Sequence, residues 1–318
     1  MRIDPDGRIA APWRRVGDNI DALRERSRRV ADRQVVVVPR LRAGEWLAIG
    51  LAAAAFVLVM GLAFDHVSVI RARALPGVVV AFFRFISEAG KSQWELYPAG
   101  VLVLVLLFGR WMIVPRFVRV FWTEVGALSA FVFASIAGVG ILVNIVKQPI
   151  GRGRPPTFDE FGAFTLQPLR FAYEFQSFPS GHSATGGALV ALAFLVFTRW
   201  RIPLLLFGLT IGASRVVVGA HYPSDVAAGL LAGFAFTMWL AAVFARYGWA
   251  FQHGATGSIR ARSGAIRRAC QSPARIAIVL AGLVDALAGR PRFIPALASI
   301  GDGSHGRSLP RIGPSDDA

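Results

Sequence analysis

The chain has 318 residues, of which 54% are hydrophobic and only 17% are charged, and its mean hydropathy is +0.52. Soluble domains rarely combine these values, so an integral membrane protein is favoured. The net charge of +16 comes mainly from arginines in the terminal segments and does not indicate nucleic-acid binding, which needs a basic face on a folded domain. Cys270 is the only cysteine, which excludes an intramolecular disulfide and makes a cysteine-based metal site implausible.

Charge and apolarity divide the chain into three segments. Residues 1–44 carry eleven arginines and six acidic residues but no apolar core. They lack the apolar region of a signal peptide and are predicted to form a tail, partly helical or disordered. Residues 45–246 contain the long apolar stretches and form the predicted membrane core. Residues 247–318 are a second basic tail, predicted to be partly disordered.

Six apolar stretches in the core predict membrane-spanning helices. We therefore expect an all-α fold, a polytopic membrane helical bundle with about six transmembrane helices. Two shorter apolar runs, 76–86 and 276–288, are too short to cross and predict interfacial or packed helices. The six predicted spans are residues 47–64, 96–114, 125–146, 182–198, 202–219 and 226–245.

The distribution of basic residues predicts the orientation. Under the positive-inside rule the basic tails place both termini in the cytoplasm, and the basic turns 115–120 and 198–201 then fall on the same side. The segment 65–95 would face outward although it holds four basic residues, which argues against this orientation. The arginine and alanine bias suggests a GC-rich bacterial genome, so we expect a multi-pass protein of the bacterial inner (cytoplasmic) membrane.

Three polar motifs interrupt the apolar core. KQPIGRGRP runs from Lys147 to Pro155 after the third span, PSGH from Pro179 to His182 opens the fourth, and SRVVVGAHYPSD from Ser214 to Asp225 joins the fifth and sixth. Crossing parity puts these span ends on one face of the membrane, whichever way the protein is inserted. The motifs can therefore form one site, which is periplasmic if both termini are cytoplasmic.

The cations and the helix start in these motifs suit a phosphate. Arginine binds phosphate oxygens with a planar fork and lysine adds a point charge, which fits Arg154, Arg215 and Lys147. Ser180 and Gly181 open a helix whose free backbone N–H groups attract anions, and glycine lets a phosphate come close. Taken singly, the cations could be interfacial residues and Pro-Ser-Gly an ordinary capped turn.

The histidines and one carboxylate supply the chemistry. His221 can attack phosphorus through one ring nitrogen while Asp225 holds the proton on the other. His182 can protonate the leaving oxygen as a general acid. Two histidines and an aspartate could also hold a metal, but three nearby cations would oppose one. We expect no metal and no cofactor.

At these residues the chain resembles the type-2 phosphatidic acid phosphatase superfamily, whose signature is K-x6-R-P, P-S-G-H and S-R-x5-H-x3-D. Lys147 with Arg154-Pro155 matches the first part, and the second and third motifs supply the rest in order. The resemblance covers roughly residues 45–246. It implies a metal-independent phosphatase with a phosphohistidine intermediate. By this resemblance the site residues are the nucleophile His221, its orienting partner Asp225, the acid His182, and phosphate-binding Lys147, Arg154, Ser180, Gly181 and Arg215.

The resemblance leaves the substrate open. A site at the membrane–water boundary predicts a membrane lipid phosphate, with lipid A phosphate or undecaprenyl pyrophosphate favoured over phosphatidylglycerol phosphate or phosphatidate. The aromatic loop 156–178 either lines a path for the lipid tail or packs over the bundle. A phosphotransferase using the same phosphoenzyme is an alternative, and so is an anion-binding transporter or scaffold. The expected partners are the lipid substrate and the bilayer, without nucleic acid, and the oligomeric state is left open.

Overall fold

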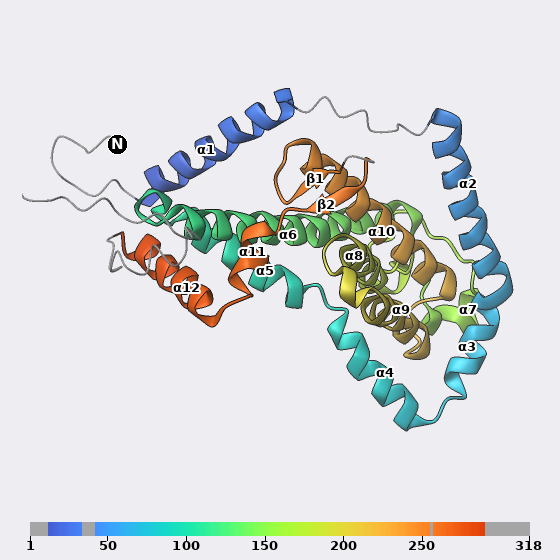
Figure 1. The fold of residues 1–318 in the computed structure, drawn as a ribbon. Helices are drawn as coiled ribbons and strands as arrows, with labels where there is room; N and C mark the ends of the chain where they lie inside the picture. Colours follow the sequence, from blue (N-terminus) through green and yellow to red (C-terminus); the bar gives the residue numbers. More distant parts are fainter. Residues whose placement is uncertain (1–11, 34–41, 255–256, 290–318) are drawn as a thin grey trace, which may run out of the picture. The chain divides into compact units, whose positions relative to one another are not determined.

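The structure is a computed structural model that describes residues 12–33, 42–254 and 257–289. Helices form nearly all of its regular structure, which confirms the all-α prediction (Figure 1). The chain folds as two compact units. One takes its described residues from 1–20, 105–126 and 263–318, and the other from 21–104 and 127–262. The second unit, hereafter the site unit, contains all three polar motifs.

Three helical segments of the described chain are long and apolar enough to cross a membrane. These are Ala43–Arg73, α6 (Arg116–Ile150) and α10 (Pro223–Arg246). The first segment is continuous through α2 (Ala43–Met60), the π-helix η1 (Gly61–Asp65) and α3 (His66–Arg73).

The other three predicted spans are shorter helices, namely α5 (Gln93–Leu107), α8 (Gly181–Leu195) and α9 (Arg201–Val217). They have 15, 15 and 17 residues, whereas a crossing needs about 20. Each of the six predicted stretches contains a helix, but the second, 96–114, was predicted too long, because α5 ends at Leu107. The number of six crossings stays a prediction.

The two short apolar runs are also helical. The first is α4 (Gly77–Ala89), which packs against α9 in the site unit. The second is α12 (Pro273–Ala288) in the other unit, where Trp122 Nε1 of α6 donates a hydrogen bond to the Val279 carbonyl at 2.8 Å. The described part of the predicted tail 247–318 is therefore folded, and residues 290–318 lie outside the description.

The remaining elements are short, except for α1 in the predicted N-terminal tail. They are α1 (Pro12–Arg33), α7 (Phe158–Phe161), α11 (Gly264–Ala269), the 3₁₀ helices η2 (Trp111–Ile113), η3 (Pro155–Thr157), η4 (Tyr173–Phe175) and η5 (Thr198–Trp200), and strands β1 (Phe251–His253) and β2 (Ile259–Ala261). The two strands pair antiparallel, with Phe251 opposite Ala261.

Glycines bring α8 and α10 into backbone contact. A Cβ on Gly233 of α10 would lie 1.9 Å from the Ala184 carbonyl oxygen, and one on Gly187 of α8 would lie 2.1 Å from that of Leu230. Small residues allow this close approach in membrane helices, where packing rather than a hydrophobic force joins helices. The contact fixes the start of α8 beside the start of α10.

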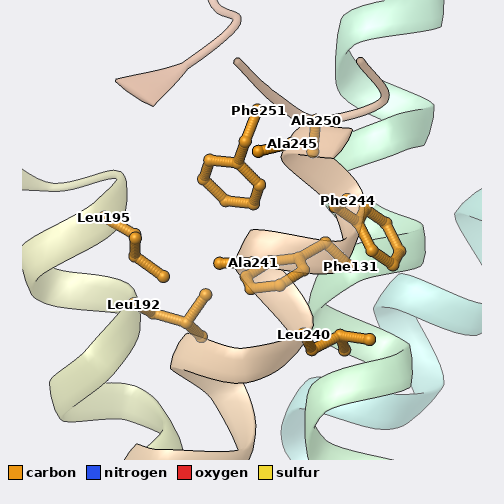
Figure 2. Close-up of a cluster of buried hydrophobic side chains, with 9 residues drawn as sticks. All are labelled: Phe131, Leu192, Leu195, Leu240, Ala241, Phe244, Ala245, Ala250 and Phe251. Carbon is orange, nitrogen blue, oxygen red and sulfur yellow. The ribbon is translucent and has the colours of Figure 1, made fainter. Parts of the chain in front are cut away.

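A hydrophobic cluster holds the opposite ends of these helices together. In Figure 2, Leu192 and Leu195 of α8 point toward Phe131 of α6 and Phe251 of β1, and Phe244 of α10 packs against Phe131. The rings of Phe131 and Phe251 meet edge to face at 4.6 Å between centroids. From Phe131 to Lys147 is 16 residues along α6, or about 24 Å. The cluster therefore supports the bundle at a distance from the polar motifs.

Candidate active site

The three motifs meet where α6 ends and α8 and α10 begin. The Ser180 N–H donates to the Asp225 carbonyl at 3.0 Å, which joins the second motif to the third. The first motif reaches the third through Arg152, which donates to the Asp225 carboxylate at 2.5 Å. The prediction that the motifs share one site agrees with these contacts.

Asp225 is a fully buried carboxylate whose two oxygens are both occupied. Oδ2 accepts hydrogen bonds from the Ser177 hydroxyl at 2.5 Å and from the Tyr222 N–H at 2.9 Å, and Oδ1 accepts from Arg152. The Nδ1 of His221 lies 3.6 Å from Oδ2, beyond hydrogen-bond length. Ser177 Oγ is also 3.5 Å from Nδ1 and thus contacts both members of the pair.

His221 lies in the turn between α9 and α10 and is only 3% exposed. Burial lowers the pKa of His221 to about 4, although Asp225 acts in the opposite direction. The imidazole is therefore neutral near pH 7. Because Nδ1 faces Asp225, Nε2 is the nitrogen that is left for chemistry.

The predicted phosphate-binding cations lie close enough for mutual electrostatic repulsion. Arg154 donates to the Tyr173 hydroxyl at 2.9 Å and to the Gln176 carbonyl at 3.2 Å, and Arg215 donates to the Ser87 hydroxyl. The Nε of each arginine is buried and has no hydrogen-bond partner among the described residues. Such an unpaired donor is costly unless a ligand accepts from it.

The start of α8 carries Ser180, Gly181 and His182. The Ser180 hydroxyl caps the helix by accepting from the Ser183 N–H at 3.4 Å. A Cβ on Gly181 would lie 3.9 Å from the Lys147 ammonium, so this lysine lies over the first turn. A negative group bound there would face both the free N–H groups of the helix and the lysine.

Two cavities of the site unit adjoin the histidines. One of about 410 Å³ is lined by His182, Lys147 and Gly181 together with apolar residues of α5 and α6, among them Leu96 and Val143. The other, about 260 Å³, is lined by His221 and by mostly apolar residues of α3, α4 and α9. Charged and apolar surfaces thus meet at the site, as an amphiphilic substrate requires.

Part of the aromatic loop 156–178 packs within the site unit, which is one of the two alternatives for this loop. Phe175 is buried and meets the ring of Phe161 edge to face at 5.8 Å, while Tyr173 stacks on Arg154. Phe164 and Phe171 are exposed. Part of the loop therefore packs and part is exposed, and a path for the lipid tail along it stays a prediction.

Three further residues belong to the site and were not among the predicted ones. Ser177 contacts Asp225 as described, and Arg152 forms ion pairs with Asp225 and with Asp65 of η1, at 2.5 and 2.6 Å. Some signals existed, since Arg152 stands inside KQPIGRGRP and Asp65 is a single acid directly after an apolar stretch. The ion pair between them could not be predicted, because the two residues lie 87 positions apart in the sequence.

Fold and site together define a helical membrane protein with a buried histidine–carboxylate pair beside clustered cations. Residues 128–249 match the PAP2 superfamily. The lipid A 1-phosphatase of Rhizobium johnstonii is 36% identical over 196 residues, which cover 62% of this chain and 80% of that protein. The chain belongs to the PAP2 superfamily and is a membrane-embedded lipid phosphatase, a phosphoric-ester hydrolase, as its three motifs predicted.

Other known proteins are similar over shorter or less conserved stretches. The lipid A 1-phosphatase of Rhizobium etli is 35% identical over 182 residues, covering 56% of this chain and 76% of that protein. Undecaprenyl-diphosphatase BcrC of Bacillus subtilis is 36% identical over 104 residues, covering 31% and 50%. The crystal structure of a PAP2-type phosphatidylglycerolphosphate phosphatase from Bacillus subtilis has a TM-score of 0.43 at 20% identity, covering 61% of this chain and 94% of that one.

Proposed function

We propose that this phosphatase removes the 1-phosphate of lipid A through a phosphohistidine on His221, at a site facing the periplasm of the bacterial inner membrane. The observation that carries the chemistry is the buried, neutral His221 against Asp225, next to cations with unpaired buried donors. The substrate is supported by two lipid A 1-phosphatases that align with this chain over 80% and 76% of their lengths. The periplasmic side is supported by the basic tails and the basic turns 115–120 and 198–201.

In the first step, Nε2 of His221 attacks phosphorus and the phosphorus–oxygen bond to the lipid breaks. His182 donates a proton to the departing oxygen once the negative charge of the bound phosphate offsets the burial and the neighbouring cations that disfavour its protonated form. Asp225 keeps the proton on Nδ1 and offsets the positive charge that the ring acquires. Lys147, Arg154, Arg215 and the N–H groups at Ser180 and Gly181 bind the phosphoryl oxygens.

In the second step, water attacks phosphorus on the side that the lipid has left, and His182 takes a proton from it. The phosphorus–nitrogen bond breaks, which returns neutral His221 and releases inorganic phosphate. A lipid hydroxyl in place of water would make the same phosphoenzyme a phosphotransferase.

The cavity beside His182 supports a lipid leaving group. An in-line displacement places the leaving oxygen opposite the nucleophile, on the side of the general acid. The cavity of about 410 Å³ on that side has an apolar wall that includes Leu96 and Val143. The departing lipid would therefore leave from the phosphate into an apolar surface.

Undecaprenyl diphosphate is the second candidate substrate, supported by the 36% identity to undecaprenyl-diphosphatase BcrC. The deciding experiment measures phosphate release by the purified full chain in lipid nanodiscs from lipid A, undecaprenyl diphosphate, phosphatidylglycerol phosphate and phosphatidate. We expect the fastest release from lipid A. A clear preference for another lipid would reassign the substrate without affecting the mechanism.

The mechanism is tested with His221→Ala in the same assay. Loss of the nucleophile should lower the rate by about 10⁴-fold or more, as for other nucleophilic sites. Within the described residues no group of three His, Cys, Asp or Glu side chains could hold a metal. EDTA should therefore leave the rate unchanged, and strong inhibition by EDTA would contradict the metal-independent mechanism.

A further inference from the structure

Asp65 is a fully buried carboxylate inside the long helical segment Ala43–Arg73. It ends the single π-helical turn η1, Gly61–Asp65. An ionisable residue within a membrane-spanning segment is costly, and its presence usually marks function. Single π-turns inside helices are likewise frequent at functional sites. Asp65 lies outside residues 128–249, so the family match does not account for it.

Asp65 has a full set of hydrogen-bond donors. Its Oδ2 accepts from Arg152 and from the Ser224 hydroxyl, both at 2.6 Å, and Oδ1 accepts from the Ser224 N–H at 3.0 Å. Ser224 is next to Asp225 in the first turn of α10. The carboxylate of one helical segment thus holds the start of another, directly beside the partner of His221.

Arg152 connects the two carboxylates. One terminal nitrogen donates to Asp65 and to the Ala163 carbonyl at 2.8 Å, and the other donates to Asp225 and to the Ser224 hydroxyl at 2.6 Å. The guanidinium also lies over the Tyr222 ring at 4.6 Å. Although burial alone would lower it, the charges of Asp225 and Asp65 raise the pKa of Arg152. The guanidinium is therefore a fixed cation shared by two anions.

We propose that Asp65 and Arg152 are positioning residues that orient Asp225 and set its charge toward His221, an inference that rests on the proposed function of His221. One cation between two carboxylates leaves a net charge of −1 in the group. Without Asp65, the whole charge of Arg152 would act on Asp225 and leave it a weaker partner for the imidazole. That partner matters most when the ring becomes positively charged as the phosphorus–nitrogen bond forms.

The electrostatics of His221 depend on every charged group that faces it. These groups are Asp225 of α10, Arg154 after α6, Arg215 of α9 and His182 of α8. Among these described groups only Asp225 favours the protonated ring, so a change in Asp225 is not compensated by one of the others. Removing the charge of Asp65 should therefore make His221 harder to protonate.

The test is Asp65→Asn in the full chain in nanodiscs, assayed with lipid A or the best substrate of the lipid panel. We expect kcat to fall about 10- to 100-fold, as for outer partners of metal-bound histidines, with KM nearly unchanged. The acidic limb of kcat/KM should move to lower pH, whereas Asp65→Glu, which keeps the charge, should retain it. The pH at which this limb falls does not depend on the concentration of folded enzyme, so a partial loss of folding would not move it.

Asp159→Asn is the matched control. Asp159 accepts two hydrogen bonds from Arg73 at 2.8 and 2.9 Å, so it also connects the first helical segment to the loop after α6. This pair is exposed and forms no hydrogen bond or ion pair with His221 or Asp225 in the described part of the chain. If Asp159→Asn and Asp65→Asn reduced kcat equally, and neither moved the acidic limb of kcat/KM, then Asp65 would have only a structural role.

Orthovanadate binding separates this inference from the proposed function. Vanadate bonds to an imidazole nitrogen and places positive charge on the ring, whereas sulfate binds only through its charge. Asp65→Asn and Arg152→Lys should weaken vanadate binding about tenfold and leave sulfate binding within twofold. Equal changes for both anions would overturn the inference. A wild-type protein inactive on the whole lipid panel would instead overturn the proposed function.

Discussion

Burial decides the protonation state of His221, and hence whether it can act as a nucleophile. A histidine with its ordinary pKa near 6.5 would be partly protonated at mildly acid pH. In this site the ring is almost fully enclosed, and its pKa is lowered to about 4. The free electron pair that the proposed mechanism needs is therefore available over most of the physiological range.

This shift predicts an acid-tolerant enzyme. The charged ring forms only as pH falls through about 4, so the enzyme-dependent limb of kcat/KM should lie there rather than near pH 6.5. Phosphate monoesters themselves titrate near pH 6, so the profile should be measured with two substrates of different phosphate pKa. A limb that lies near pH 6.5 with both substrates would contradict the buried, neutral state of His221.

The same shift affects stability in a defined direction. Between pH 6.5 and about 4 the unfolded chain binds a proton at His221 that the folded chain does not. The contribution of this histidine to stability is thus present above pH 6.5 and declines as pH falls toward 4.

Ser177 is predicted to contribute to catalysis through Asp225. Its hydroxyl donates to Oδ2 at 2.5 Å, and hydrogen bonds to charged groups contribute about 1.5–3 kcal/mol. Ser177→Ala should lower kcat about tenfold or more with little change in KM. Ser135→Ala is the control, because Ser135 is equally buried and its hydroxyl has no partner in the described chain. Equal losses in both variants would indicate a packing effect.

For single residues, the sequence predicted which charged side chains belong to the site better than which of them form pairs. His221, Asp225 and the cations could be found because crossing parity brings their span ends to one face. Arg152 could not be separated from Arg154, since two arginines in a polar loop look alike until one is buried between carboxylates. Asp65 looked like the end of a span, because its partner lies 87 positions away in sequence.

The contact between α8 and α10 is the element on which the site geometry depends. Ser180 begins one helix and Asp225 the other, and the glycines along the two helices allow their backbones to touch. Apolar length alone predicted both helices and nearly their bounds. It could not predict which helices pair, because their glycine-rich sequences permit close contact on several sides.

Gly233→Ala should destabilise the bundle strongly. The added Cβ would lie 1.9 Å from the Ala184 carbonyl oxygen, and backbone cannot move aside as a side chain can. Overpacking typically costs about 1–3 kcal/mol, and we expect the upper end of that range. Thermal unfolding in detergent measures the effect. Gly50→Ala in α2 is the matched control, because nothing lies within 4 Å of its Cβ. Equal melting temperatures for the two variants would show that this contact does not limit stability.

Two further elements have features that the pattern of apolar residues did not predict. The π-turn Gly61–Asp65 occurs within an unbroken apolar helix, and nothing in the composition of that stretch marks it. The run 276–288 was too short for a span, yet α12 packs one face on α6, where a Cβ on Gly282 would lie 2.5 Å from the Val118 side chain. A basic segment that looks like a tail can thus contribute helices to a folded unit.

For the whole molecule, the number of membrane crossings predicts which span ends share a face more firmly than the basic residues predict which face that is. The ends of the third and fifth spans and the starts of the fourth and sixth share a face for either insertion. The hydrogen bond from Ser180 to Asp225 and the ion pair of Arg152 with Asp225 agree with that. The choice of face depends on the basic tails and on the basic turns 115–120 and 198–201, whereas the basic residues in 65–95 argue against it. Orientation therefore needs its own measurement.

The single cysteine makes both the orientation and the span count testable. Cys270 is exposed and follows the sixth predicted span, and Glu160 is exposed in the loop after the third. Three crossings between them should place these positions on opposite sides. A membrane-impermeant maleimide applied to intact spheroplasts should label the Cys270→Ser, Glu160→Cys double variant and should spare the wild type until the membrane is permeabilised. Cys270→Ser alone controls for background.

The reversed pattern would place the active site in the cytoplasm, because the loop at Glu160 shares its face with the ends of α6 and α9. The parity argument would survive that result. Labelling of both positions from the same side would be more serious, since an odd number of crossings cannot join them. In that case one of the helices α8, α9 and α10 would not span the membrane, and the shorter two, with 15 and 17 residues, would be the first to reconsider.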